Sequence, residues 1–89
     1  MVAFDEAIAL YEEVERRLAD ATEPELRAQV ATAMVNRGRT LGGLGRSAEE
    51  IAAYEDVERR FADATEPELR ARVAMARMAH EELNDPKEC

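Results

Sequence analysis

The chain has 89 residues, of which 36% are charged, and a formal net charge of −8. This length is typical of one small domain and excludes two independently folded ones. The excess of negative charge argues against nucleic acid and anionic membranes as partners, because proteins bind both with Lys and Arg.

The first predicted element is a helix from Phe4 to Ala19. Its apolar residues recur at steps of three and four, which places them on one face of a helix with 3.6 residues per turn. This stripe consists of Phe4, Ile8, Tyr11, Val14 and Leu18. We expect this face to be buried.

The second predicted helix begins at the segment DATEPEL. Thr22 is a suitable N-cap, Glu25 is at the capping-box position, and Pro24 is tolerated in the first turn. The residues expected to be buried are Leu26, Val30, Ala33, Leu41 and Met34. The helix is predicted to end in the run 42–45, where Gly45 supplies a left-handed C-terminal cap.

Two further helices follow the same plan. The third is predicted from Ala48 to Ala62, with Ser47 as its N-cap and Glu50 at the capping-box position. Its apolar stripe contains Ile51, Tyr54, Val57 and Phe61. The fourth begins after Thr65 and stops at Asn84-Asp85-Pro86. It is expected to bury Leu69, Val73, Ala76 and some of Met75, Met78 and Leu83.

An internal repeat relates these helices. The segment YEEVERRLADATEPELRAQVATA, Tyr11–Ala33, returns 43 residues later as YEDVERRFADATEPELRARVAMA, Tyr54–Ala76, and only four of the 23 positions differ. The sequence therefore predicts one all-α domain, residues 1–89, built from copies at about 4–46 and 47–89. With the first and third helices termed B and the second and fourth termed A, four antiparallel helices follow in the order B-A-B-A.

The junction between the copies resembles the tetratricopeptide repeat (TPR) family. Asn36, Gly38, Leu41, Gly45, Ile51 and Tyr54 have the spacing of that family, and so do Ala7, Ile8, Tyr11 and Val14 in the first helix. The family repeats every 34 residues, whereas this chain repeats every 43, so the chain is similar to an extended variant. Gly38 and Ala7 are expected where paired helices approach closely.

The resemblance implies a concave groove, lined by the A helices, that holds an extended peptide or a partner helix. The residues implied to face this groove are Thr32, Val35, Asn36, Arg39, Gly43, Met75, Met78, Ala79 and Glu82. Some family members clamp a peptide carboxylate with Lys and Asn. Only Asn36 matches that clamp, with Arg39 as a substitute for Lys, which argues against it here.

Self-association is expected from the ends of the array. The first B helix has no preceding A helix, and the pattern of the second A helix is lost where Glu81 replaces the Gly38 equivalent. Two repeats without polar caps leave apolar stripes open. A homodimer, formed by stacking or by exchange of helices through Gly42-Gly43, would cover them. The alternative is a monomer whose four helices close into a bundle.

The sequence contains no set of residues with the pattern of a catalytic, phosphate-binding or metal site. The run GRTLGGLGRS lacks the Lys of a phosphate-binding loop, and His80 is interpreted as part of a solvated helix end. Three methionines, Met34, Met75 and Met78, suit either a core or an adaptable binding surface. Acidic residues near Arg16, Arg17, Arg59 and Arg60 indicate surface charge pairs. We therefore expect no enzyme activity, cofactor or metal.

The functional expectation is a protein-interaction or scaffold module that binds a peptide or helix through apolar helix faces. The alternative is a purely structural, self-assembling repeat with no external ligand. The N-terminal residues are acidic and form no apolar run, so we expect a cytoplasmic protein. Cys89, the only cysteine, excludes an intrachain disulfide and is expected to have no role.

Overall fold

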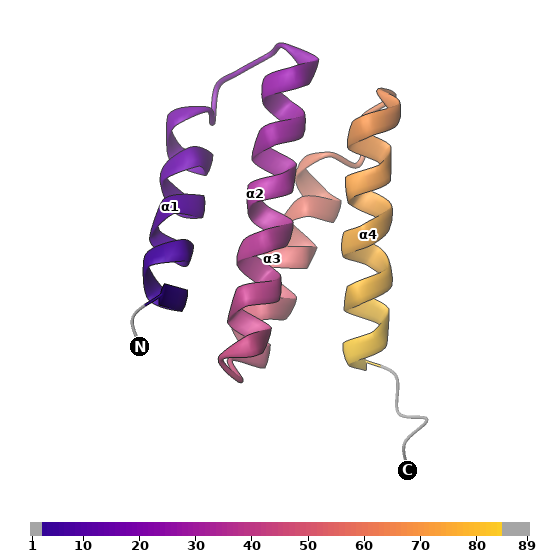
Figure 1. Cartoon of the computed structure of the whole chain (residues 1–89). Helices are drawn as coiled ribbons and strands as arrows, with labels where there is room; N and C mark the ends of the chain where they lie inside the picture. The colour runs from indigo at the N-terminus through magenta and orange to yellow at the C-terminus, as the bar shows by residue number, and fades with distance from the viewer. Residues whose placement is uncertain (1–2, 85–89) are drawn as a thin grey trace.

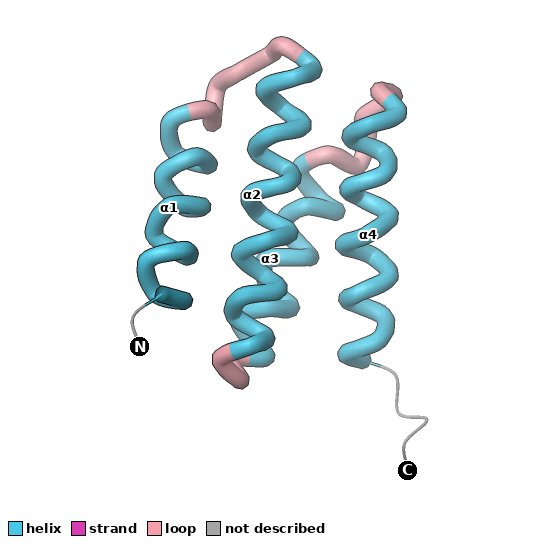
Figure 2. Tube along the Cα trace, viewed as in Figure 1, coloured by secondary structure: helices cyan, strands magenta, loops and turns pink. Residues whose placement is uncertain are grey.

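The computed structural model describes residues 3–84, which form four helices joined by short turns (Figures 1 and 2). They are α1, Ala3–Arg17; α2, Pro24–Gly43; α3, Ser47–Arg60; and α4, Pro67–Asn84. Over these residues the fold is all-α, as predicted, and the ends predicted for α1 and α3 differ from the observed ones by one or two residues. The predictions for the side chain of Phe4 and for Asp85, Pro86 and Cys89 fall outside the described part.

The predicted N-caps of α2 and α3 are wrong. Glu23, not Thr22, is the N-cap of α2, and it makes no side-chain capping bond. Proline fits best at the first helical position, so Pro24 places the start one residue later than predicted. Ser47 is already inside α3, and Arg46 precedes it without a side-chain capping bond.

The predicted end of α2 is confirmed. Gly45 adopts a positive φ of 77°, a conformation that glycine tolerates without the steric cost of a Cβ. The amide of Gly45 donates to the carbonyl of Gly42 at 3.0 Å, and the amide of Arg46 donates to that of Leu41 at 2.9 Å. These two bonds form a Schellman motif, which satisfies the free carbonyls and turns the chain back into α3.

Helix α2 is the centre of the fold. It packs against α1, α3 and α4, while α3 also packs against α4. Among the four described helices, α1 packs against α2 alone, and α3 lies behind α2 and α4 (Figure 1). The result is a flat molecule of 43 × 31 × 15 Å in which α1 stands at one edge.

The core lies between α2, α3 and α4. Its largest fully buried side chains are Val30, Tyr54, Val57 and Leu69. The predicted stripe residues Ile8, Tyr11 and Val14 of α1 are only half-buried, because this helix has one neighbour instead of two. The other predicted core residues divide as follows: Ala33, Met34, Leu41, Phe61, Val73 and Ala76 are buried, Leu26, Ile51 and Met75 are half-buried, and Met78 and Leu83 are exposed.

Candidate protein-binding grooves

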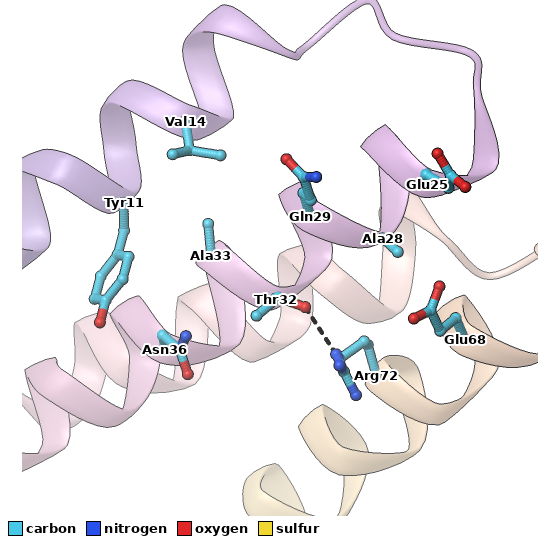
Figure 3. Close-up of a pocket in the computed structure, with 10 residues that line it drawn as sticks. All are labelled: Tyr11, Val14, Glu25, Ala28, Gln29, Thr32, Ala33, Asn36, Glu68 and Arg72. Atoms are coloured by element: carbon cyan, nitrogen blue, oxygen red, sulfur yellow. Dashed lines mark hydrogen bonds between the residues drawn. The ribbon is translucent and has the colours of Figure 1, made fainter.

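An open groove lies along α2, between α1 on one side and α4 on the other (Figure 3). Its volume is about 550 Å³. The residues that line it are Tyr11, Val14, Glu25, Ala28, Gln29, Thr32, Ala33, Asn36, Glu68 and Arg72. We refer to this hollow as the α1–α2 groove.

The α1–α2 groove combines apolar walls with a polar rim. Tyr11 and Val14 extend from α1 towards α2, where the small residue Ala33 is buried (Figure 3). Exposed Glu25 and Glu68 add two carboxylates to the rim. Apolar walls with a few polar groups at the edge are typical of sites that bind another molecule.

Arg72 links the two A helices across this groove. Its Nε donates a hydrogen bond of 2.8 Å to the hydroxyl of Thr32, and its Nη1 lies 3.8 Å from the sulfur of Met75 (Figure 3). Thr32, a predicted binding residue, is therefore engaged within the chain. Sequence reasoning did not identify Arg72, although its replacement of Gln29 is one of the four differences between the copies.

A second hollow, of about 370 Å³, lies between α2, α3 and α4. It contains five of the residues predicted to face a groove, namely Arg39, Met75, Met78, Ala79 and Glu82. Its other lining residues are Glu50, Tyr54 and Leu83. Both hollows follow the seam between α2 and α4, since Arg72 of the first contacts Met75 of the second.

The remaining predicted binding residues occupy three different environments. Asn36 is half-buried and lines the α1–α2 groove. Val35 is only 2% exposed and belongs to the core, so its side chain is not available on the surface. Gly43 is exposed at the end of α2, outside the lining of both hollows.

Tyr54 forms a fixed wall of the second hollow. A Cβ at Gly38 would come within 2.5 Å of the ring of Tyr54, so only glycine allows this approach of α2 and α3. The Tyr54 hydroxyl donates to Glu50 at 2.8 Å, which is the role of this carboxylate in place of the predicted capping box. Burial, and then the hydrogen bond to Glu50, raise the pKa of Tyr54 above its ordinary value.

Equivalent side-chain contacts join each B helix to the A helix that follows it. In the first copy Arg37 donates to both carboxylate oxygens of Glu15, at 2.7 and 3.1 Å. In the second copy Glu58 and His80 hold the same two positions, with 2.9 Å between Oε2 and Nδ1. The His80 side chain is only 17% exposed, so its interpretation as part of a solvated helix end is wrong.

The predicted surface charge pairs are present for three of the four arginines. Arg16 and Arg17 pair with Glu13, and Arg59 pairs with Asp56. The prediction is wrong for Arg60, whose guanidinium donates to the carbonyl of Ala19 at 2.9 Å and lies 5.7 Å from the centre of the Phe61 ring. It connects α3 to the turn after α1.

The described residues offer neither a cluster of metal-ligating side chains nor a helix suited to span a membrane. Residues 3–84 contain no group of three or more His, Cys, Asp or Glu side chains placed to hold a metal ion. Over the same range, no helix combines the length and the apolar content that a membrane span requires.

No protein-family model, curated protein or solved structure matches this chain.

Proposed function

We propose that this chain is a protein-interaction module that binds a peptide or a helix of another protein in the α1–α2 groove and along the adjoining seam between α2 and α4. The observation that carries the proposal is the α1–α2 groove, with its apolar walls and its rim of Glu25, Gln29 and Glu68. The second hollow continues the same seam and adds exposed Met78, whose flexible thioether adapts to varied apolar partners.

We further propose that the two copies stack in the manner of TPR repeats, with α2 and α4 as A helices and α1 and α3 as B helices. The contact of Gly38 with Tyr54 supports this, because the resemblance implies close approach at this glycine. The equivalent pairs Glu15–Arg37 and Glu58–His80 support it too, since each joins a B helix to the next A helix in the same way.

Self-assembly is the second candidate function. Leu10 and Met78 are about two-thirds exposed, at 65% and 66%, although leucine and methionine are residues that proteins usually bury. They lie on α1 and α4, the two helices that flank the central α2. Association of copies through these helices would cover both side chains.

Selection from a displayed peptide library tests the first function. Peptides selected on the wild-type chain are then titrated against Gln29→Trp, which fills the rim of the groove from an exposed position of α2. We expect binding to weaken at least tenfold by isothermal titration calorimetry, because the indole occupies the space of the peptide.

The matched control is Ala52→Trp, at an exposed position of α3 outside both hollows. It adds the same side chain and should leave the affinity unchanged. A library that yields no binder, or binders that respond equally to both variants, would argue against this function. A chain that yields no binder and sediments as a dimer would favour self-assembly.

A further inference from the structure

The exposures of equivalent residues in the two copies can be compared, and they differ at α1, which stands at one edge of the molecule. Tyr54 is 1% exposed and Val57 is fully buried, yet their first-copy equivalents Tyr11 and Val14 are only half-buried. At the position before Tyr11, Leu10 is 65% exposed, whereas its equivalent Ala53 is buried. Because the Tyr and Val are identical in the two copies, the cause of their different exposures lies in their neighbours.

The neighbour that differs is helix α2. It packs against α3 and α4 of the second copy, whereas no described helix packs in the equivalent place against α1 and α2. The surface of α1 and α2 therefore corresponds to the surface of α3 and α4 on which α2 itself lies. This comparison indicates that a helix similar to α2 would fit on the surface of α1 and α2.

The contacts that α2 makes specify the chemistry of such a helix. Gly38 faces the ring of Tyr54, Thr32 accepts a hydrogen bond from Arg72, and Arg27 pairs with Glu66 at 3.5 Å. The corresponding first-copy residues are Tyr11, Gln29 and Glu23. A helix bound there would place a glycine against Tyr11, a hydrogen-bonding side chain against Gln29 and a basic residue against Glu23.

The residues on the free face of α4, at the opposite edge of the molecule, indicate that this helix does not come from a second copy of the chain. On α4, Arg77 replaces buried Met34 and Glu81 replaces Gly38, and both replacements are exposed. If α4 of another copy docked on α1, Glu81 would meet Tyr11 where the structure tolerates only glycine. Its α2 is already packed against three helices. End-to-end growth of the array is thus blocked by two charges.

We propose that the outer surface of α1 and α2 is a docking site for one amphipathic helix of a partner protein, with a glycine facing Tyr11 and a basic residue facing Glu23. This inference rests on the proposed function and names its partner class. Acidic Glu6 and Glu25 on these two helices favour a partner with basic flanks.

The test uses a peptide with the sequence of residues 22–46, which contains α2, added to the full chain. A lactam between Glu25 and the variant Gln29→Lys, both exposed in α2, preforms the helix away from its docking face. We expect saturable binding, with amide shift changes at Leu10, Tyr11 and Val14 in nuclear magnetic resonance spectra. The Gly38→Glu peptide, which copies Glu81, should bind at least tenfold more weakly.

Two chain variants that add the same carboxylate at exposed positions locate the site. Leu10→Glu should weaken peptide binding at least tenfold, whereas Ala52→Glu, on α3 outside both hollows, should leave it unchanged. If the peptide displaces the chain's own α2 instead, both variants will respond alike, and the proposal is wrong. The proposal is also wrong if the chain alone forms a dimer that Leu10→Glu dissociates.

The outcome is separable from that of the proposed function. If library-selected peptides bind and respond to Gln29→Trp while the α2 peptide fails to bind, the groove binds proteins but not this class of helix. If neither kind of peptide binds, both the function and its partner class are contradicted.

Discussion

At the scale of single residues, the tightest packing constraint is the contact of Gly38 with the ring of Tyr54, which leaves no room for a side chain at residue 38. The resemblance to the TPR family implied a close approach of paired helices at this glycine. The sequence did not predict that Val35, three positions earlier, is buried, because the side of α2 that is covered depends on where α3 and α4 pack. The same limit applies to the hydrogen bond from Arg72 to Thr32. It joins residues 40 positions apart, which the 43-residue repeat does not relate.

Gly38→Ala should destabilise the fold by about 1–2 kcal/mol, because overpacking against the buried Tyr54 ring outweighs the gain in helix propensity. Gly43→Ala is the matched control, since nothing lies within 4 Å of its added Cβ. It should stabilise the fold by up to about 1 kcal/mol through propensity alone. Urea unfolding measures both changes, and equal effects of the two variants would contradict the proposed contact.

Ionisation of Tyr54 should lower the free energy of unfolding at alkaline pH. Its pKa is raised in the folded state by burial, whereas the unfolded chain ionises near the ordinary value of about 10. The contribution is therefore fully present below about pH 10 and is lost as the pH rises above that value. Tyr54→Phe should show a smaller loss of unfolding free energy between pH 9 and pH 11.5. An identical loss in both proteins would mean that Tyr54 ionises freely when folded.

At the scale of elements, the repeat and the turn residues located all four helices, but local signals misplaced two of their starts. Thr22 and Ser47 are residue types that often cap helices. The start of α2 is instead determined by Pro24, and the start of α3 by the turn at Gly45, which has a positive φ. The link between Glu58 and His80 was also missed. The 43-residue offset applied to Glu15 and Arg37 would have found it, because both second-copy positions carry groups that can form a hydrogen bond.

His80→Arg should increase stability by about 0.5–1.5 kcal/mol, because the guanidinium can form the two-bond pair that Arg37 makes with Glu15. The reciprocal change Arg37→His should decrease stability by a similar amount. Both are measured by urea denaturation at pH 8. Changes of the same sign in the two variants would show that the copies do not use these positions in the same way.

At the scale of the whole molecule, the arrangement is asymmetric. The edge formed by α1 is apolar and half-covered, with Leu10 and Tyr11 accessible, while the free face of α4 carries Arg77 and Glu81. The sequence predicted two open ends and therefore self-association. The comparison of exposures between the two copies instead indicates an apolar edge at α1 that can bind a helix and a charged edge at α4 that cannot. This difference favours a partner protein over a second copy of the chain.

The mass of the chain in solution, measured by light scattering over a concentration series with reductant for Cys89, tests most directly whether the α1 edge is left free for a partner. We predict a monomer of 10.0 kDa at every concentration. A reversible dimer that Leu10→Glu converts to monomer would contradict this account, because a second copy would then occupy the edge.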